Sequence, residues 1–378
     1  MNFWHVWAIG VGAVVGDGIF LLMGEGAKIA GPSAVLAYFF SGILLLFIMV
    51  SMGEMSVGMP DAGAMWVWNK RLSGELAGFI TGICYTTGWV IAGGSVGLAI
   101  GRLSTWFLQI GPSEEISVII WGIFWISLFA AINLRGVVVA ANTQLALVLG
   151  LVCLVLLFSI ISFISGKVDF QNFKPFAPNG WKNIFPAIAY GTYAYMGSLT
   201  LATSGSEVKN PENLPRGLVW ASLTVIVIYT FAMTAMFGLI PSDKLNVAES
   251  PFVSAAKVSF GRASAFIVNA GAFLAAATCL LAGTMYSAPR LLYSMGKKGI
   301  IPGAFARVSE KKKVPFTAVV FVWVISIILI LIGLKDPDVI YVYLSLLLVF
   351  SWAVTLSLIH ISEPTRPLYI SYAVFCLK

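Results

Sequence analysis

An aspartate lies inside the first long apolar stretch of the chain, between two glycines, as Gly16-Asp17-Gly18. Paired glycines weaken a helix and leave backbone polar groups without partners. At membrane depth such a backbone is tolerated only where it lines a cavity, and a carboxylate there costs about 2.5–3.5 kcal/mol on insertion scales. We therefore predict that Asp17 is a proton carrier or a counter-ion for an amine. The alternative is a neutral, hydrogen-bonded structural acid.

A second stretch rich in glycine and hydroxyl groups lies near the middle of the chain, where residues 193–200 read Tyr-Ala-Tyr-Met-Gly-Ser-Leu-Thr. Two interrupted helices would present opposed half-helix ends. Amide N–H groups at one end suit a carboxylate, and free carbonyls at the other suit an ammonium or Na⁺. A zwitterion fits that pair. The alternative, that the glycines only allow close helix packing, does not account for the carboxylate of Asp17.

The composition indicates that lipid surrounds the elements that carry these residues. Of 378 residues, 59% are hydrophobic and 10% are charged, against about 25% charged in soluble domains. Continuous apolar stretches of about 20 residues, enough to cross a bilayer as a helix, recur throughout the chain. We predict an all-α polytopic membrane protein. The ten expected spans are approximately 4–29, 33–59, 76–107, 116–134, 141–165, 184–204, 217–240, 262–288, 315–334 and 339–358.

The formal charge of +7 is distributed as expected for a membrane protein. With a cytoplasmic N-terminus, the cytoplasmic segments hold a modest excess of Lys and Arg, including the basic run Lys311–Lys313. We interpret that run as a topology determinant beside anionic lipid and not as a nucleic-acid site. The first span lacks a small-residue cleavage site, so we expect a retained helix and not a signal peptide.

The cysteine and histidine pattern gives no indication of an enzyme. The four cysteines are scattered without metal or redox spacing, and His5 and His360 lie near opposite ends of the chain. The sequence contains no H-E-x-x-H, and no G-x-S-x-G with a histidine to serve it. We predict no enzymatic activity, no metal site and no cofactor, apart from a coupling ion, H⁺ or Na⁺.

The ten spans divide into two sets of five. The longest polar connection, Gly166–Lys182, falls between spans five and six, and an odd number of spans per half makes the second half enter the membrane inverted. We predict a first five-helix repeat (1–165), an extracytoplasmic connection (166–183) and a second, inverted repeat (184–358).

From about Leu358 the apolar pattern fails. Residues 359–378 contain two prolines and several charges, followed by an apolar string too short to span. They resemble translated sequencing-adapter read-through. We therefore expect a non-native tail and a chain truncated at its C-terminus.

Four ordered signatures resemble those of the amino acid–polyamine–organocation (APC) superfamily permeases, in particular the amino acid permease family. Residues 16–20 resemble G-S/A/T-G-I-F, and residues 52–64 resemble E-(M/L)-x…P-x-A-G-G. Residues 207–216 resemble E-V-K-N-P-x-x-x-P-R, and residues 286–302 resemble S-x-x-R-x-L-Y-A-M-G-x-x-G-x-L-P. Together they extend over roughly residues 1–355.

The resemblance implies two inverted five-helix repeats with broken first and sixth helices, a leucine-transporter-like fold, with substrate between the breaks. Backbone of Gly16, Gly18 and Ile19 is expected at the substrate carboxylate. Tyr193, at the family's gating-aromatic position, is expected on the amine side, although ordinary aromatic packing is an equal alternative. The full set of expected substrate-binding residues is Gly16, Asp17, Gly18, Ile19, Tyr193, Ala194, Gly197 and Ser198.

The chain departs from the family pattern at two places. Asp17 replaces a small residue, and Gly197-Ser198-Leu199 stands where many relatives have G-F-E. Relative to the family pattern, this chain therefore has a carboxylate in span one and lacks the carboxylate of span six. Span five contains no lysine, a position that some proton-coupled relatives use. Hydroxyls of span eight, such as Thr278 and Ser287, could ligate Na⁺ or bond their own backbone.

Four charged residues are candidates for a cytoplasmic gate. Glu207, Lys209, Arg216 and Arg290 are expected on the cytoplasmic side, where they could form a charge network that closes the inner gate. The alternative is helix capping together with positive-inside anchoring.

Together these features predict a secondary active transporter that moves amino acids or related amines across the cytoplasmic membrane by alternating access. The driving force would be H⁺, Na⁺ or exchange. The alternatives are an amine or polyamine exchanger in which Asp17 pairs the ammonium, and a non-transporting amino-acid sensor that uses the same pocket. The expected partners are the small-molecule substrate and the lipid bilayer, without nucleic acid. The oligomeric state is left open.

Overall fold

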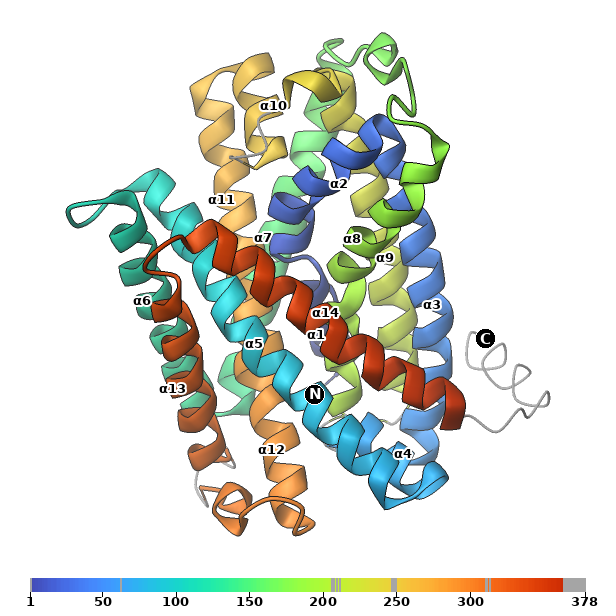
Figure 1. Ribbon diagram of the computed structural model, residues 1–378, viewed down its shortest axis with the longest axis vertical. Helices are drawn as coiled ribbons and strands as arrows, with labels where there is room; N and C mark the ends of the chain where they lie inside the picture. Colours follow the sequence, from blue (N-terminus) through green and yellow to red (C-terminus); the bar gives the residue numbers. More distant parts are fainter. Residues whose placement is uncertain are drawn as a thin grey trace.

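The computed structural model describes residues 2–61, 63–204, 208, 210, 212–245, 250–309, 312 and 314–362. Within these ranges the chain forms helices and no strand (Figure 1), which confirms the predicted all-α class. The α-helices are α1 (Phe3–Val14), α2 (Met23–Ala30), α3 (Ala34–Gly58), α4 (Met65–Ser73), α5 (Glu75–Phe107), α6 (Glu114–Leu134), α7 (Val137–Ile164), α8 (Ile184–Tyr195), α9 (Asn213–Leu239), α10 (Pro251–Phe260), α11 (Arg262–Cys279), α12 (Ala288–Lys297), α13 (Phe316–Ile332) and α14 (Pro337–Ser362).

The helices account for all ten predicted spans. Seven helical stretches of the described chain are long and apolar enough to cross a membrane. The first of them, Phe3–Gly58, contains the first two predicted spans. The other two predicted spans correspond to the shorter α13 and to α8 with the 3₁₀-helix η5 (Met196–Ser204).

The eighth span is longer and less regular than predicted. After α11 the chain forms a π-helix, η7 (Leu280–Ser287), and continues as α12 to Lys297, nine residues beyond the expected end at 288. Pro289 lies in the first turn of α12, where a missing N–H is tolerated. The helix is continuous from α11 through the π-helix into α12, so the proline does not end the span.

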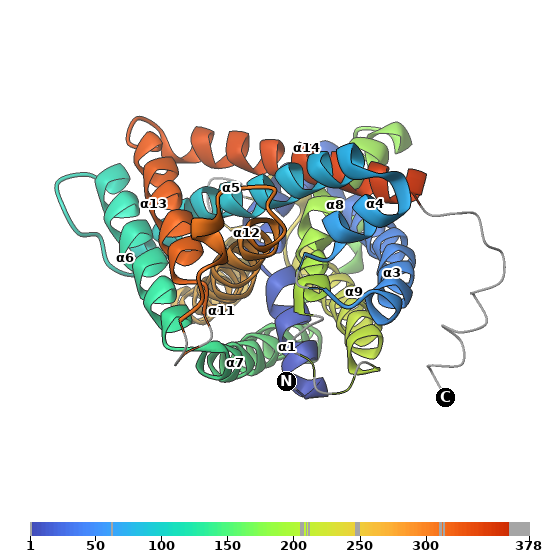
Figure 2. The same ribbon diagram turned by 90° about the horizontal axis from the view of Figure 1, so that it is seen from below.

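The two interrupted helices lie side by side in the centre of the bundle. α1 packs against η5, α7 and α9, and α2 packs against α8. Figure 2 shows α1 between α7 and α9. α5 and α14 pack against each other and cross one side of the bundle diagonally, while α4 and α12 lie at one end and α10 at the other (Figure 1).

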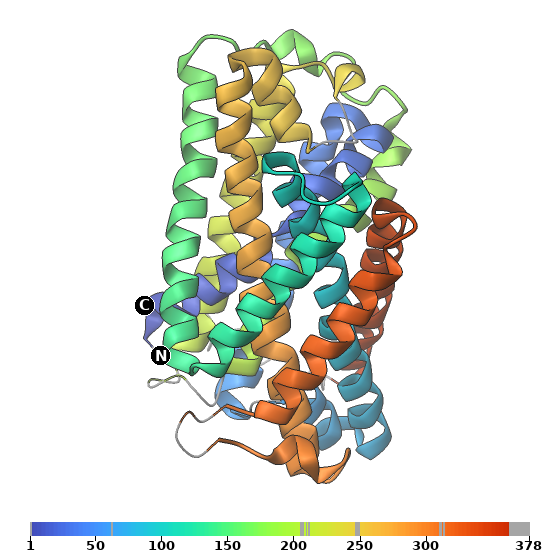
Figure 3. The ribbon, with the colours of Figure 1, turned by 90° about the vertical axis from the view of Figure 1, so that its left-hand side faces the viewer.

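The outer helices expose apolar side chains in the way that lipid favours. On α7, which runs along an edge of the bundle in Figure 3, Leu149, Leu157 and Ile161 are between 46% and 54% exposed. Such contiguous apolar surface is rare on soluble monomers. The molecule is therefore a multi-pass membrane protein.

The predicted connection between the two sets of five spans, residues 166–183, lies between two helices and is mostly not helical. α7 ends at Ile164 and α8 begins at Ile184, with the 3₁₀-helices η3 (Phe170–Phe173) and η4 (Trp181–Asn183) between them. α14 continues to Ser362, four residues past Leu358. The remainder of the predicted tail, residues 363–378, lies outside the described chain.

Candidate functional site: a pocket at two broken helices

The first helix breaks at Val15 and Gly16. α1 ends at Val14, and Val15 has φ −75° and ψ 85°, outside the helical region. Asp17 returns to helical angles, and the chain continues through the π-helix η1 (Gly18–Leu22) into α2. We call η1 together with α2 the outer half-helix. The carbonyl end of α1 and the amide end of the outer half-helix therefore meet at Gly16, as the sequence predicted.

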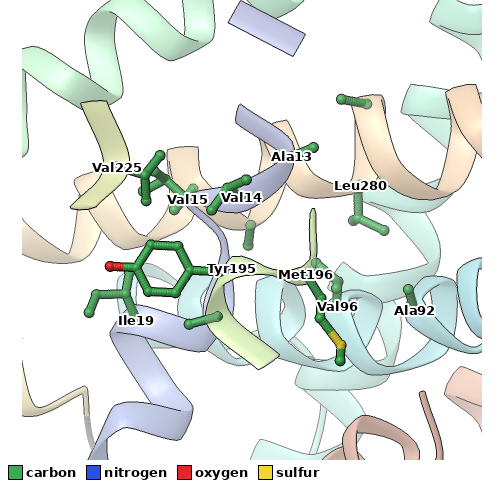
Figure 4. Packing of buried hydrophobic residues seen from close by; sticks show 14 of the residues in the cluster. Ala13, Val14, Val15, Ile19, Ala92, Val96, Tyr195, Met196, Val225 and Leu280 are labelled. Atoms are coloured by element: carbon green, nitrogen blue, oxygen red, sulfur yellow. The ribbon is translucent and has the colours of Figure 1, made fainter. Parts of the chain in front are cut away.

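The second interrupted helix changes from an α-helix to a narrower 3₁₀-helix where it packs against α1, and the two backbones approach each other very closely. α8 ends at Tyr195 and gives way to η5. A Cβ on Gly197 would overlap the carbonyl group of Ala13, so only glycine allows this backbone contact. Figure 4 shows the buried hydrophobic residues around the breaks, with Val14 and Val15 of the first helix near Tyr195 and Met196.

Two buried tyrosines satisfy carbonyls at the breaks. The hydroxyl of Tyr229 on α9 donates to the carbonyl of Val14 at 2.8 Å and lies 3.2 Å from that of Ala194. Tyr85 on α5 donates to the carbonyl of Leu199 at 2.6 Å. Because a free carbonyl in the bilayer interior is costly, these hydroxyls stabilise the interruptions.

Asp17 has hydrogen-bond donors around it but no cation from the described part of the chain. Its carboxylate Oδ2 accepts from the hydroxyl of Tyr341 on α14 at 2.7 Å and from that of Tyr193 on α8 at 3.1 Å. The side chain is 2% exposed. No Lys or Arg of the described chain forms an ion pair with it. Its position in the first turn of the outer half-helix is favourable for a negative charge.

A small pocket opens at the break beside Asp17, with about 20 Å³ of free space, room for about one water molecule. None of its described lining residues carries a positive charge. The lining is Ala13, Val14, Gly16, Asp17, Gly18, Trp89, Ala92, Val96, Tyr193, Ala194, Gly197, Cys279, Leu348 and Trp352.

The pocket has a polar end and an aromatic end. Tyr341 holds Asp17 at the polar end, and Trp352 lies eleven residues further along α14, a rise of about 16 Å toward α4. Trp352 packs on Trp89 of α5 with ring centroids 4.5 Å apart. Within the described chain the indole N–H of Trp352 has no hydrogen-bond partner.

Six of the eight expected substrate-binding residues lie together in this pocket: Gly16, Asp17, Gly18, Tyr193, Ala194 and Gly197. The other two are outside the lining. Ile19 is buried in the hydrophobic core. Ser198 is buried and donates to the carbonyl of Tyr195 at 2.9 Å, the backbone bonding that is common for hydroxyls in membrane helices.

The sequence interpretation missed the contributions of α5 and α14. Tyr341, Leu348 and Trp352 are spaced by seven and four residues, which places them on one face of a helix. The tyrosine and the tryptophan on that face would have indicated a pocket-facing surface. No comparable spacing in the sequence indicated Tyr229.

The predicted charge network on the α12 side is described only in part. Arg216 pairs with Glu212 one helical turn away, at 3.4 Å. Arg290 is 6% exposed, donates to the carbonyl of Tyr286 at 2.7 Å and lies over its ring. Glu207 and Lys209 lie outside the described residues, so the gate stays a prediction.

The hydroxyls considered as Na⁺ ligands in span eight bond to the backbone of their own helix. Thr278 donates to the carbonyl of Ala275 at 2.9 Å, and Ser287 lies 3.4 Å from that of Ala282 and 3.2 Å from the Thr203 hydroxyl. In span five, the amide of Gln144 donates to the Thr278 carbonyl at 3.2 Å.

A second aspartate, outside the spans, has a cation partner. Asp61 follows α3 and accepts from the Nζ of Lys298 at 2.6 Å, from the Gly63 amide at 2.8 Å and from the Ser294 hydroxyl at 3.1 Å. Partial burial disfavours its charge, but the hydrogen bonds from Lys298, Gly63 and Ser294 together hold the pKa of Asp61 below its usual value.

The comparisons with known proteins agree with this geometry. The family model "Amino acid permease" matches residues 5–369. The branched-chain amino acid permease BcaP of Bacillus subtilis is 27% identical over 85% of this chain and 72% of its own length. The methylthioribose transporter of the same organism is 31% identical over 82% and 69%, respectively.

One solved structure shows the same fold at low identity. MhsT in complex with L-phenylalanine superposes with a TM-score of 0.66 and 15% identity, over 99% of this chain and 94% of MhsT. The ten-helix plan with broken first and sixth helices is therefore the leucine-transporter fold, as predicted. The chain belongs to the amino acid permease family of the APC superfamily and is a secondary transporter for amino acids or amines.

Proposed function

We propose that this transporter holds its ligand between the two helix breaks, against Asp17, and carries it across the cytoplasmic membrane by alternating access. The observation that supports this most is the carboxylate of Asp17. It is buried beside the pocket and receives two tyrosine hydroxyls, but no cation of the described chain neutralises it. A carboxylate left in that state is costly, so a ligand or ion that brings a positive charge would be favoured there.

The two ends of the pocket serve as its two gates in this proposal. Asp17, Tyr193 and Tyr341 close the polar end, and Trp89 with Trp352 closes the aromatic end. About 20 Å³ of free space is much too small for an amino acid, so one end has to open before a ligand enters. Alternating access then requires that the halves 1–165 and 184–358 move so that only one end opens at a time.

Asp17 is also the proposed coupling group. A bare carboxylate is unfavourable in transit, so its charge is compensated by H⁺, by Na⁺ or by an ammonium in each direction. The broken helices supply backbone groups for the rest of the ligand: Gly16 and Gly18 at the amide end, and Ala194 and Gly197 on the opposite side.

The orientation follows from basic residues at the α4–α12 end of the bundle. Lys70 and Arg71 lie in the last turn of α4, and Lys297 in that of α12. The positive-inside rule favours this end on the cytoplasmic side, which supports the proposal of a cytoplasmic N-terminus. The proposed membrane is the cytoplasmic membrane.

The test is uptake into proteoliposomes of a radiolabelled panel of amino acids, amines and polyamines under imposed pH or Na⁺ gradients. Asp17→Asn is compared with wild type, and Asp243→Asn, an exposed aspartate on the 3₁₀-helix η6 (Ser242–Lys244), is the matched control. We expect concentrative uptake or exchange of at least one compound, lost in Asp17→Asn and kept in Asp243→Asn.

Two results would count against the proposal. Full gradient-driven uptake by Asp17→Asn would remove Asp17 from the mechanism and leave the permease. Binding of a panel member without uptake or exchange under any gradient would instead support the sensor alternative.

A further inference from the structure

We propose that the ligand of this pocket is an organic ammonium compound without a carboxylate, because Asp17 already occupies the place where a ligand carboxylate would bind. This inference rests on the proposed function and deepens it by naming the substrate class. It concerns which charged groups the ligand brings, so it can fail while the permease mechanism stands.

The amide end of the outer half-helix is the natural position for a ligand carboxylate at this break. The first turn of a helix has N–H groups without partners in the helix and a partial positive charge. In this chain Asp17 begins that half-helix, which continues to Ala30. The protein's own acidic residue therefore stands at the start of this half-helix, with its carboxylate bonded to two tyrosine hydroxyls and not to the amides of the first turn.

The nearest side-chain donors are already used by that carboxylate. Tyr193 and Tyr341, which come from two other helices, both direct their hydroxyls at Oδ2 of Asp17, at 3.1 Å and 2.7 Å. A ligand carboxylate at the break would compete for these donors and would lie beside a like charge, which disfavours both. A ligand ammonium would meet the opposite charge, and because it is itself a hydrogen-bond donor it would not compete for these hydroxyls.

The rest of the lining offers no cation for a carboxylate placed elsewhere. Among the described lining residues there is no Lys, Arg or His. The walls are small or apolar side chains such as Ala92, Val96 and Leu348. The far end is the tilted ring pair of Trp89 and Trp352, and the indole nitrogen of Trp352 faces the backbone of Gly88. These surfaces suit an alkyl or aryl body, and aromatic faces also favour a cation.

Charge balance in transit points to exchange. With an ammonium bound, Asp17 and the ligand are neutral together on the way across. On the return, Asp17 is neutral if it carries a proton or a second ammonium. The expected modes are therefore amine/H⁺ antiport and amine/amine exchange. In both modes Asp17 and its bound cation are neutral together in each direction.

The test uses pairs of compounds that differ only in the α-carboxyl group: leucine with isopentylamine, and phenylalanine with phenethylamine. Binding to wild type is measured by calorimetry, and uptake by proteoliposomes that contain the purified protein. We expect each amine to bind at least about tenfold more tightly than its amino acid. Amine uptake is expected to be driven by an outward-directed proton gradient, from inside to outside the vesicle.

A reciprocal variant sharpens the test. Asp17→Ser removes the built-in carboxylate and restores a small residue, so the preference is expected to invert, with the amine weakened and the amino acid strengthened. Asp17→Asn keeps the size and removes the charge; it is expected to lose amine binding without gaining the amino acid. Asp243→Asn controls for the loss of a negative charge elsewhere.

The comparison of each amine with its amino acid on wild-type protein tests the inference even if the Asp17 variants do not fold. Uptake of leucine or phenylalanine in preference to its amine would overturn the inference and leave the permease function intact. Uptake of γ-aminobutyrate in preference to butylamine would overturn it as well, because that ligand carries a carboxylate. Failure to bind or transport any amine or amino acid would contradict both the inference and the proposed function.

Discussion

Two aspartates of this chain differ in how the charge of the carboxylate is compensated. Asp61, after α3, has a lysine at 2.6 Å together with a backbone amide and a serine hydroxyl. Asp17, at the break of the first helix, accepts from two tyrosine hydroxyls and has no cation partner among the described residues. Both are well hydrogen-bonded, but among the described residues a cation balances the charge of Asp61 and none balances that of Asp17. We infer that Asp61 serves the structure, and that the charge of Asp17 is left for the transported species to balance.

The largest expected effect comes from removing the partners of each carboxylate. The double variant Tyr193→Phe/Tyr341→Phe takes both donors from Asp17, and we expect uptake to fall about 100-fold, since hydrogen bonds to a charged group contribute about 1.5–3 kcal/mol each. Lys298→Met, which takes the cation from Asp61, is expected to change initial uptake less than about threefold. Equal losses in the two variants, measured in proteoliposomes at matched protein, would remove the distinction between the sites.

A single tyrosine gives a smaller effect with a close control. Tyr341→Phe removes the shorter of the two bonds to Asp17, and we expect about a tenfold loss of ligand affinity. Tyr343→Phe changes a 65% exposed side chain two residues along the same helix and should leave affinity unchanged. Calorimetric titration of the two variants checks this, and a similar loss in Tyr343→Phe would show a general effect of α14.

Thermal stability should change in opposite directions when each aspartate becomes asparagine. Asp17→Asn removes a buried charge without a cation, so the ligand-free protein is expected to gain about 1 kcal/mol in its free energy of unfolding. Asp61→Asn breaks a partly exposed ion pair and should lose about 1 kcal/mol or less. The measurement is the unfolding temperature in detergent without ligand. Destabilisation by both substitutions would mean that Asp17 is balanced within the protein after all.

The contribution of Asp61 should also depend on pH. Its pKa is lowered in the folded protein, so its stabilisation is complete above the unfolded value of about 3.9 and is lost as pH falls through the lowered folded value. The difference in unfolding temperature between wild type and Asp61→Asn is expected to be constant from pH 7 to 5 and to shrink below about pH 4. A difference that grows on acidification would contradict the ion pair with Lys298.

The sequence predicted the parts of this molecule that depend on local patterns. The ten spans followed from continuous apolarity, and the breaks followed from Gly16, Gly18 and Gly197, because glycine marks a backbone that lines a cavity or approaches another closely. Six of the eight expected pocket residues lie in the pocket for the same reason. Ile19 and Ser198 lie outside it, since the direction of a side chain depends on the helical phase after a break, which no local pattern gives.

Contacts between distant spans could not be predicted in this way. The bonds from Tyr341 to Asp17 and from Tyr229 to Val14 join residues 324 and 215 positions apart. Whether a tyrosine in an apolar helix faces lipid, a neighbouring helix or a pocket is decided by packing. The same holds for the link between Asp61 and Lys298, which joins two loops that the sequence separates by 237 positions.

The most direct test of the central claim is calorimetric ligand binding to wild type, Asp17→Asn and Asp61→Asn, with the best ligand of the uptake panel. If the ligand or its co-transported ion balances the charge of Asp17, affinity should fall at least about 30-fold in Asp17→Asn and stay within about twofold of wild type in Asp61→Asn. Unchanged affinity in a folded Asp17→Asn protein would contradict the account.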